Sequence, residues 1–208
     1  MLKPYRKFNC LEVGIDEVGA GCLAGPVTIA AVVWPQNFDE EMREQLLMIK
    51  DSKKLNEKQR YMARDFILEH AIDLSIVDID NQEIDQINIL QARLKGFHKA
   101  IDKLSIIPEH ILVDGNQFKI YTAKNGEIIP DTQVMNGDNT YQSIAAASIV
   151  AKCHRDDYMK SIHIEYPIYK WEKNKGYGTQ EHRDSIIAHG NSKYHRKTFG
   201  TCKDAKNN

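Results

Sequence analysis

The sequence has little cysteine and no long apolar stretch. Its four cysteines form no C-x-x-C pair and have no histidine at zinc-finger spacing, which argues against a structural zinc site. We therefore expect reduced thiols. No segment approaches the ~20 apolar residues of a membrane span, and the amino terminus lacks the apolar core of a signal peptide. These absences predict a cytoplasmic protein that has no contact with membranes.

Net charge is also nearly absent. The chain has 28 Lys and Arg residues and 29 Asp and Glu residues, so no global field favours nucleic acid. The distribution is uneven, because the stretch from Lys170 to the end has nine basic residues and only four acidic ones. A basic end beside an acidic body fits a protein that binds phosphates in one place and metals in another. A solvated surface helix would carry the same charges, so both interpretations stay open.

Repeats, low-complexity tracts and linkers are absent, and 208 residues are enough for one sizeable core. Apolar runs predict strands at Cys10–Asp16, Pro26–Trp34, Ile72–Ile79, His110–Asp114 and Thr132–Met135. Helical spacing predicts helices at Glu40–Ile49, Glu57–His70 (with Asn56 as N-cap), Gln82–Leu104 and Tyr141–Tyr158. A hairpin followed by alternating helices and strands predicts an α/β fold, a mixed sheet flanked by helices. We expect residues 1–166 to form the main domain and 167–208 a small helical lobe packed on it.

Acidic residues follow apolar segments at three separate places. Asp16 and Glu17 come at the end of the first predicted strand, before a glycine-rich turn. Neighbouring strand residues point to opposite faces, so both reach one site only if the strand ends or bends there. Asp114 closes a later strand, and Asp138 lies beside Gly137 just before a helix. Each has a plainer interpretation, since Asp114 suits an Asx turn and Asp138 a helix N-cap.

Together the four carboxylates suggest a metal site. Hard oxygen ligands without a His/Cys cluster suit Mg²⁺ or Mn²⁺ better than Zn²⁺. Two such ions about 3.5–4 Å apart activate a water and stabilise the leaving oxygen when a phosphodiester is cut. Phosphate and carboxylates would repel each other without these cations.

Several motifs in order resemble the ribonuclease HII (type 2 ribonuclease H) family. The resemblance runs from about Glu12 to Gly200, over nearly the whole chain. Its motifs are Gly14-Ile15-Asp16-Glu17-Val18-Gly19, Leu23-Ala24-Gly25-Pro26-Val27, Asp51-Ser52-Lys53-Lys54-Leu55, Val113-Asp114-Gly115-Asn116, Ala145–Lys152 with Arg155-Asp156, Lys175-Gly176-Tyr177-Gly178-Thr179 with His182, and His195–Phe199.

The resemblance implies a ribonuclease H-like fold and activity on RNA/DNA hybrids. It implies that Asp16, Glu17, Asp114 and Asp138 bind the catalytic metals. It also implies cleavage on the 5′ side of single ribonucleotides in duplex DNA, leaving a 3′-hydroxyl and a 5′-phosphate. The related ribonuclease HIII has a long amino-terminal domain, and we expect none here because the first motif begins at Gly14.

Substrate contacts are expected from residues around the acids. By the resemblance, Tyr177 lies against the deoxyribose beside the scissile bond. Ser52, Lys53 and Lys54 lie in a loop before a helix, where they could bind a phosphate. A solvated lysine pair without a ligand explains the same residues equally well. His182 and His195 are expected to pack or to contact phosphate. The expected substrate-binding residues are Gly19, Ala20, Gly21, Ser52, Lys53, Lys54, Asn116, Lys152, Arg155 and Tyr177.

One position departs from the family pattern. Gly19-Ala20-Gly21 stands where the family usually has Gly-Arg-Gly. In the family, this loop contacts the ribonucleotide through its backbone, and the arginine adds a phosphate contact. Alanine keeps the backbone amides and removes the charge, so we expect catalysis to be retained with weaker binding.

Two other functions fit parts of the sequence. A type 1 ribonuclease H would share the acids but need a run of ribonucleotides, and a duplex with a single ribonucleotide separates the two. A non-catalytic nucleic-acid-binding protein would fit a decayed site at Ala20, although all four acids are present. We expect a monomer that binds RNA/DNA hybrids and ribonucleotide-containing duplex DNA.

Overall fold

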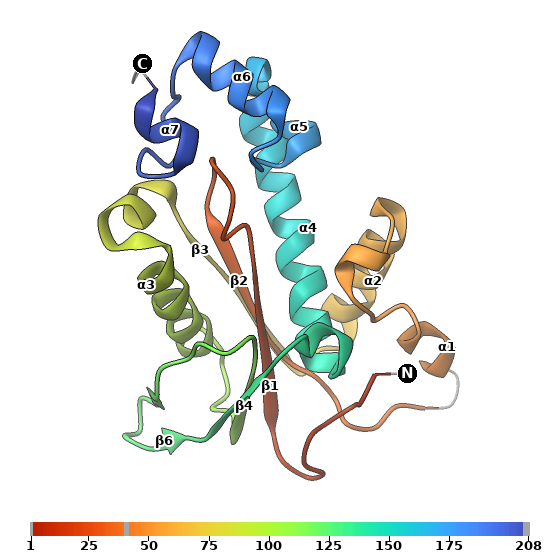
Figure 1. The fold of residues 1–208 in the computed structure, drawn as a ribbon. Coiled ribbons are helices and arrows are strands. Elements are labelled where there is room, and N and C mark those ends of the chain that lie inside the picture. Colours follow the sequence, from red (N-terminus) through yellow and green to blue (C-terminus); the bar gives the residue numbers. More distant parts are fainter. Residues whose placement is uncertain (1, 40–41, 206–208) are drawn as a thin grey trace.

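The computed structural model describes residues 2–39 and 42–205, and a five-stranded mixed sheet lies at its centre (Figure 1). The strand order is β3-β2-β1-β4-β7. These strands are β1 (Glu12–Val18), β2 (Val27–Val33), β3 (Asp73–Ile79), β4 (His110–Asp114) and β7 (Asp131–Val134). Strands β1, β2 and β3 pair antiparallel, whereas β4 is parallel to β1 and β7 to β4. A separate hairpin joins β5 (Tyr121–Thr122) and β6 (Ile128–Ile129).

Helices cover both faces of this sheet (Figure 1). The main ones are α2 (Glu57–His70), α3 (Asn81–Asp102) and α4 (Gln142–Glu165). Ile29 of β2 belongs to the core beneath α3, and its neighbour Ala30 belongs to the core beneath α2 and α4. Strand β2 is therefore buried on both faces, which explains its continuous apolar sequence. This architecture confirms the predicted α/β fold class.

Small residues let α4 approach β1 closely. A Cβ atom added at Gly14 would lie 2.3 Å from the backbone carbon of Ser143. The alanines that follow, Ala145 to Ala147, are fully buried in this contact layer. The close approach brings the beginning of α4 against the strand that carries Asp16 and Glu17.

The boundaries of some elements differ from the predictions. Strand β1 continues two residues past Asp16, and α4 runs seven residues past Tyr158, to Glu165. The helix predicted at Glu40–Ile49 is only α1 (Arg43–Leu46), and residues 40 and 41 lie outside the described residues. Helix α3 is kinked at Asn88, which has a φ of 64°. The β5–β6 hairpin was not predicted.

The segment after α4 packs on the β1–β2 loop and on the end of α4. It contains α5 (Trp171–Asn174), α6 (Gln180–His189) and α7 (Gly200–Asp204), as Figure 1 shows. Single-turn 3-10 helices occur at Ser52–Lys54 (η2), Gly137–Asn139 (η3) and Pro167–Tyr169 (η4). Trp171 is fully buried in a cluster with Leu23 and Met159. Among the described residues, no helix is long and apolar enough to cross a bilayer.

Candidate active site

The adjacent acids Asp16 and Glu17 meet at a step in the sheet edge. The β1–β4 pairing ends with Ile15 opposite Val113, and β4 stops at Asp114, while β1 continues to Val18. Asp16 therefore stands where its neighbouring strand is ending. The sequence suggested that β1 itself would have to end or bend, but the end of β4 opens the space instead.

Asp16 is buried among other acids. Its side chain is 7% exposed, accepts a hydrogen bond from the Glu17 amide at 2.7 Å and interacts with Ser148 of α4. Burial, followed by the negative charges of Glu17 and Asp114, raises the pKa of Asp16 well above its usual range. The site therefore holds a carboxylate whose negative charge is poorly compensated.

Glu17 and Asp114 have partial compensation. Glu17 forms an ion pair with Arg93 of α3 at 2.8 Å, yet burial still raises its pKa. Asp114 accepts a hydrogen bond from the Gly137 amide at 2.6 Å. Burial raises the pKa of Asp114 as well, and the nearby charge of Asp138 acts in the same direction.

Asp138 lies in η3 and does not cap α4. The N-cap of α4 is Tyr141, so the N-cap interpretation of Asp138 was wrong. The Asp138 carboxylate instead accepts a hydrogen bond from Asn139 Nδ2 at 3.1 Å and lies 3.5 Å from Lys53 Nζ. Its neighbour Gly137 bonds to Asp114, so η3 brings Asp138 close to the other acids.

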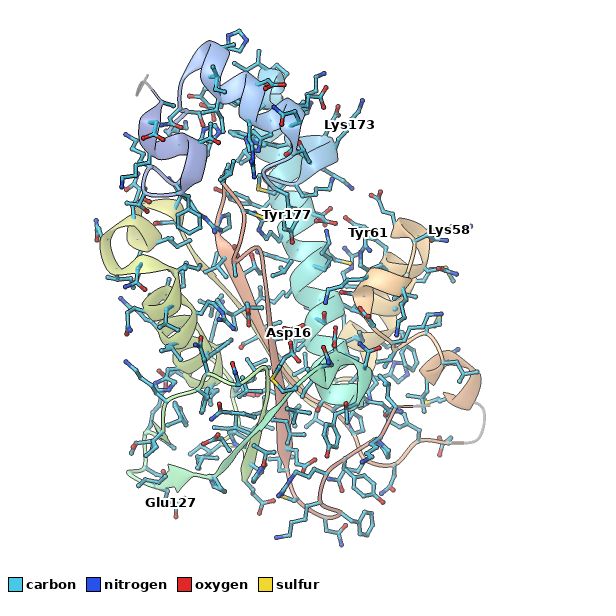
Figure 2. All side chains as sticks on the ribbon, viewed as in Figure 1. Asp16, Lys58, Tyr61, Glu127, Lys173 and Tyr177 are labelled. Carbon is cyan, nitrogen blue, oxygen red and sulfur yellow. The ribbon has the colours of Figure 1, made fainter. Side chains whose placement is uncertain are left out.

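A cavity of about 310 Å³ gathers most of the predicted residues. Figure 2 labels Asp16 near the middle of the molecule and Tyr177 below the C-terminal helices. The cavity is lined by Asp16, Glu17, Val18, Gly19, Ala20, Gly21, Ser52, Lys53, Asp114, Ser148, Lys152 and Tyr177. A larger hollow of about 760 Å³ near α6 and α7 has a single lining carboxylate, Asp204, among the described residues. The chemistry therefore favours the smaller cavity.

The lysine loop is held beside the acids. Asp51 caps η2 by accepting the Lys53 amide at 3.0 Å, and Ser52 Oγ lies 3.0 Å from Ser148 Oγ. Burial lowers the pKa of Lys53, but the carboxylates of Asp138, Asp51 and Asp16 outweigh it and raise that pKa overall. The Lys54 ammonium binds Asn139 Oδ1 at 2.5 Å. Both lysines therefore face the acid cluster, although their side chains remain largely exposed.

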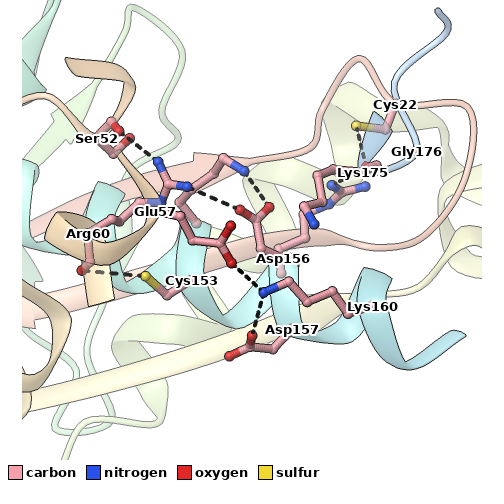
Figure 3. A network of polar contacts seen from close by, with 12 residues as sticks. Cys22, Ser52, Glu57, Arg60, Cys153, Asp156, Asp157, Lys160, Lys175 and Gly176 are labelled. Carbon is pink, nitrogen blue, oxygen red and sulfur yellow. Dashed lines mark hydrogen bonds and ion pairs between the residues drawn. The ribbon is translucent and has the colours of Figure 1, made fainter. Parts of the chain in front are cut away.

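Arg60 of α2 holds the lysine loop, residues 51–55, through two of its backbone carbonyls (Figure 3). Its guanidinium donates to the Ser52 carbonyl at 3.1 Å and to the Leu55 carbonyl at 3.2 Å. It also lies 3.6 Å from Asp156, whose other oxygen pairs with Lys152. Lys152 thus lines the cavity with its ammonium group already paired.

Arg155 and Asn116 do not line the cavity. Arg155 was expected to reach a nucleic acid backbone, but it is fully buried. Its guanidinium donates to the carbonyls of Pro26, Lys175 and Ala24 at 2.7–3.0 Å. Its role is therefore to hold the glycine-rich loop, and the prediction of a direct contact was wrong. Asn116 is exposed on the turn after β4, outside the cavity lining, and its predicted contact stays a prediction.

The segment Gly19–Gly25, which we call the glycine loop, has three carbonyls directed toward a buried arginine. Arg196, also fully buried, donates to the carbonyls of Gly19, Ala20 and Gly25 at 2.8–3.0 Å. In the described part of the chain, the amides of Ala20 and Gly21 donate to no acceptor and so remain available. Gly19 has a φ of 89°, and a Cβ there would lie 2.2 Å from Arg155 Nε, so only glycine fits.

Tyr177 also lines the cavity, and its side chain is 42% exposed. Burial of part of its ring, followed by the nearby Cys22 thiol, raises the pKa of its hydroxyl. The Gly176 carbonyl accepts the Leu23 amide at 2.8 Å. This bond joins the Tyr177 turn to the glycine loop, so the two sides of the cavity are directly connected.

Some residues that shape the site had no functional signal in the sequence. Arg93 is one of several cations on an amphipathic helix, and nothing in the spacing connects it with Glu17. The sequence does contain a weak signal for Ser148, because its side chain is a hydroxyl within an alanine-rich, apolar stretch. In the structure Ser148 lines the cavity.

The donor set suits hard divalent cations. All four acids offer oxygen, and burial raises the pKa values of Asp16, Glu17 and Asp114, so a bound cation would offset the cost of their buried negative charges. The Lys53 ammonium beside Asp138 partly supplies the missing positive charge. In the part of the chain that the structure describes, no three such residues are close enough to form a ready-made metal site. The fit therefore rests on donor chemistry and charge.

A sequence model of the family described as Ribonuclease HII matches residues 13–202. The chain belongs to the ribonuclease HII family. It is 48% identical over 208 residues to Ribonuclease HII of Bacteroides thetaiotaomicron, covering 100% of this chain and 98% of that one. It is 44% identical to Ribonuclease HII of Flavobacterium psychrophilum, covering 96% and 95% of the two chains.

Solved structures share the fold of this chain. Ribonuclease H2 from Pyrococcus horikoshii OT3 superposes with a TM-score of 0.73 at 24% identity, over 93% of this chain and 95% of that chain. Bst-RNase HIII in complex with Mn²⁺ gives 0.67 at 22% identity, over 92% and 68%. Family membership makes this chain a ribonuclease H endonuclease that acts on RNA/DNA hybrids, in a family that depends on divalent metal ions.

Proposed function

We propose that this ribonuclease HII also cuts on the 5′ side of single ribonucleotides in duplex DNA, leaving a 3′-hydroxyl and a 5′-phosphate. The observation that carries the proposal is the composition of one cavity. Acids, a loop with available backbone amides and an exposed tyrosine line the same space of about 310 Å³. One embedded ribonucleotide differs from its neighbours by a 2′-hydroxyl, so its recognition needs hydrogen-bonding groups next to the hydrolytic acids.

Asp16, Glu17, Asp114 and Asp138 would hold two divalent ions, Mg²⁺ or Mn²⁺. When bound, such ions supply an activated water and stabilise the leaving oxygen. The protein contributes a buried, negatively charged cluster on the sheet edge, with Asp16 only 7% exposed. Low solvent access strengthens the attraction between these carboxylates and a cation.

The remaining residues would orient the substrate. Ala20 and Gly21 line the cavity, and their amides, which have no acceptor among the described residues, would donate to the 2′-hydroxyl. Tyr177 would lie against the deoxyribose beside the scissile bond. Lys53 and Lys54 are exposed enough to meet phosphates, and Lys152 could do so only by sharing its ammonium with Asp156.

We also propose a monomer that acts in the cytoplasm. All four cysteines are unpaired, which suits a reducing compartment. The proposed division into a catalytic domain (1–166) and a C-terminal lobe (167–208) is supported by the short helices that follow α4.

The test uses three labelled duplexes: an RNA/DNA hybrid, a DNA duplex with one ribonucleotide, and an all-DNA control. We expect Mg²⁺- or Mn²⁺-dependent cleavage of the first two, with a product end that a DNA polymerase can extend. Cleavage of the hybrid alone would show that a run of ribonucleotides is required, and the single-ribonucleotide activity would be excluded.

A further inference from the structure

Two histidines lie directly behind Tyr177. His182 of α6 and His195 are fully buried among the rings of Tyr169 and Trp171. His182 Nδ1 lies 2.9 Å from the Tyr177 carbonyl, and its Nε2 lies 3.1 Å from His195 Nε2. His195 Nδ1 accepts the Ser192 amide at 2.9 Å. We call His182 and His195 the histidine pair.

The network assigns one tautomer to each ring. The Ser192 amide donates to His195 Nδ1, so a neutral His195 has its proton on Nε2 and donates to His182 Nε2. The same His182 nitrogen also faces the Trp171 indole N–H at 3.1 Å, so it must be an acceptor. His182 then has its proton on Nδ1 and donates to the Tyr177 carbonyl.

Both rings are held neutral by these contacts. A proton added to His182 Nε2 or His195 Nδ1 would point at another N–H group. Burial, followed by the neighbouring His182, lowers the pKa of His195 to about 3, and burial lowers the pKa of His182. Both rings are fully buried, so neither can contact solvent or substrate as a general base or a phosphate ligand.

The Tyr177 turn needs such an anchor. Tyr177 is flanked by Gly176, which has a φ of 82°, and by Gly178, so its local backbone has unusual freedom. The Thr179 amide closes a tight turn on the Tyr177 carbonyl at 2.9 Å. Among the described residues, His182 is the one that connects that carbonyl to the packed interior of the C-terminal helices.

The pair also connects to the other side of the cavity. His195 forms a β-bridge with Ala24, and the next residue, Arg196, binds the carbonyls of Gly19 and Ala20. One buried segment therefore fixes both the glycine loop and, through the histidine pair, the Tyr177 turn. The buried residues His195 and Arg196 therefore set the distance between the glycine loop and the Tyr177 turn.

We infer that His182 and His195 are positioning residues that set the place of Tyr177 and so determine selectivity for a single ribonucleotide. This rests on the role proposed above for Tyr177. The histidines touch no substrate, and their effect passes through the Tyr177 backbone. A displacement of about 1 Å in a positioning group can cost on the order of 100-fold in rate.

The test compares His182→Phe with His182→Asn. Phenylalanine keeps the ring volume without a donor, whereas the asparagine amide can place an N–H near the position of Nδ1. We expect His182→Phe to lower kcat/KM for the single-ribonucleotide duplex roughly 10- to 100-fold relative to the RNA/DNA hybrid. His182→Asn should keep most of that selectivity ratio.

A matched control separates positioning from stability. Tyr169→Phe removes a buried hydrogen bond to the Gly190 carbonyl in the same cluster and leaves the pair intact. It should lower Tm without changing the selectivity ratio. In the Tyr177→Ala background, His182→Phe should have little further effect on that ratio.

The outcomes are distinct. All variants are assayed at a temperature well below their Tm. If Tyr177→Ala then loses selectivity while His182→Phe retains it, the inference is overturned and the proposed function stands. If Tyr177→Ala itself keeps full selectivity, both the role of Tyr177 and the inference fail.

Discussion

The acids of the site differ in how their charges are balanced. Glu17 has Arg93 at 2.8 Å and Asp138 has Lys53 at 3.5 Å. Asp16 forms no ion pair within the described residues, although it is the most acid-crowded of the set. The proposed metal site thus contains a buried carboxylate without an ion-pair partner, and this carboxylate opposes folding when no cation is bound.

Replacing Asp16 should therefore stabilise the metal-free protein. Asparagine retains an acceptor for the Glu17 amide and removes a buried charge near Glu17 and Asp114. We expect Asp16→Asn to raise the free energy of unfolding at pH 7 in EDTA, because it removes a buried charge that the folded state disfavours. Cleavage should be lost. A lower Tm than wild type in EDTA would contradict the charge repulsion.

Asp138→Asn should remove most of the activity while sparing the fold. The amide keeps the shape of the side chain and can still accept the bond from Asn139, but it loses the charge that attracts a cation. The measurements are cleavage in Mg²⁺ and Tm. A purified variant that cuts at near wild-type rate would show that Asp138 is no ligand.

Ala20→Arg should tighten the binding of ribonucleotide-containing duplex. Ala20 lines the cavity while its carbonyl is held by Arg196, so a longer side chain can reach outward without releasing the loop. One added phosphate contact should steepen log affinity against log salt by up to about 0.9. A salt titration of binding in Ca²⁺ measures this slope. Equal slopes and affinities for both proteins would place residue 20 away from phosphate.

Three of the acids predicted to share a site line one cavity, whereas Arg155 lies outside it. Asp16, Glu17 and Asp114 were found because they end or follow apolar strands beside glycine. Arg155 follows Lys152 on α4 and looked equally suited to phosphate. Only the fold shows that Arg155 points toward buried carbonyls, because burial of a helix face depends on partners that are distant in sequence.

At the level of elements, α4 and the glycine loop stabilise each other. Arg155 of α4 donates to the carbonyls of Ala24 and Pro26 at the end of this loop and to that of Lys175, and a Cβ added at Gly19 would lie 2.2 Å from Arg155 Nε. Predicting the elements was most successful where periodicity was long, as in α2 with its Asn56 capping box. The β5–β6 hairpin escaped because strands of two residues carry no periodic signal.

Arg155→Met should destabilise the protein strongly. Methionine fills much of the buried volume but leaves three carbonyls without their donor, and each unsatisfied buried group costs about 1–3 kcal/mol. We expect a loss of at least about 3 kcal/mol in the free energy of unfolding by urea. Lys203→Met, on the exposed side of α7, is a matched control that should change it little. A loss in Arg155→Met no larger than in the control would contradict the buried role.

For the whole molecule, the histidine pair predicts a dependence of stability on acid. Both histidines have folded pKa values below the unfolded value of about 6.5. The unfolded chain then binds more protons than the folded one as pH falls from about 6.5 toward 3, so their contribution to stability is lost in that window. Above pH 7 this contribution is constant.

The acids of the site oppose this trend, because their raised folded pKa values favour the folded state at low pH. A difference measurement isolates the pair. His195→Gln keeps a donor toward His182 and cannot titrate, so between pH 6.5 and 4.5 wild type should lose about 1.4 kcal/mol per pH unit more than the variant. Parallel stability curves from urea unfolding would show that His195 is not held neutral.

The pairing of β1 with β4 has a consequence during synthesis. Glu12 of β1 pairs with His110 of β4. During synthesis, the edge of β1 that faces β4 therefore stays unpaired until nearly a hundred more residues have been added. A ribosome that adds about 5–20 residues per second leaves that edge open for roughly 5–20 s. An open apolar edge would invite pairing with another nascent chain, but Asp16 and Glu17 place two negative charges on it. The two carboxylates proposed to bind metal would thus also oppose pairing of this open edge with another chain.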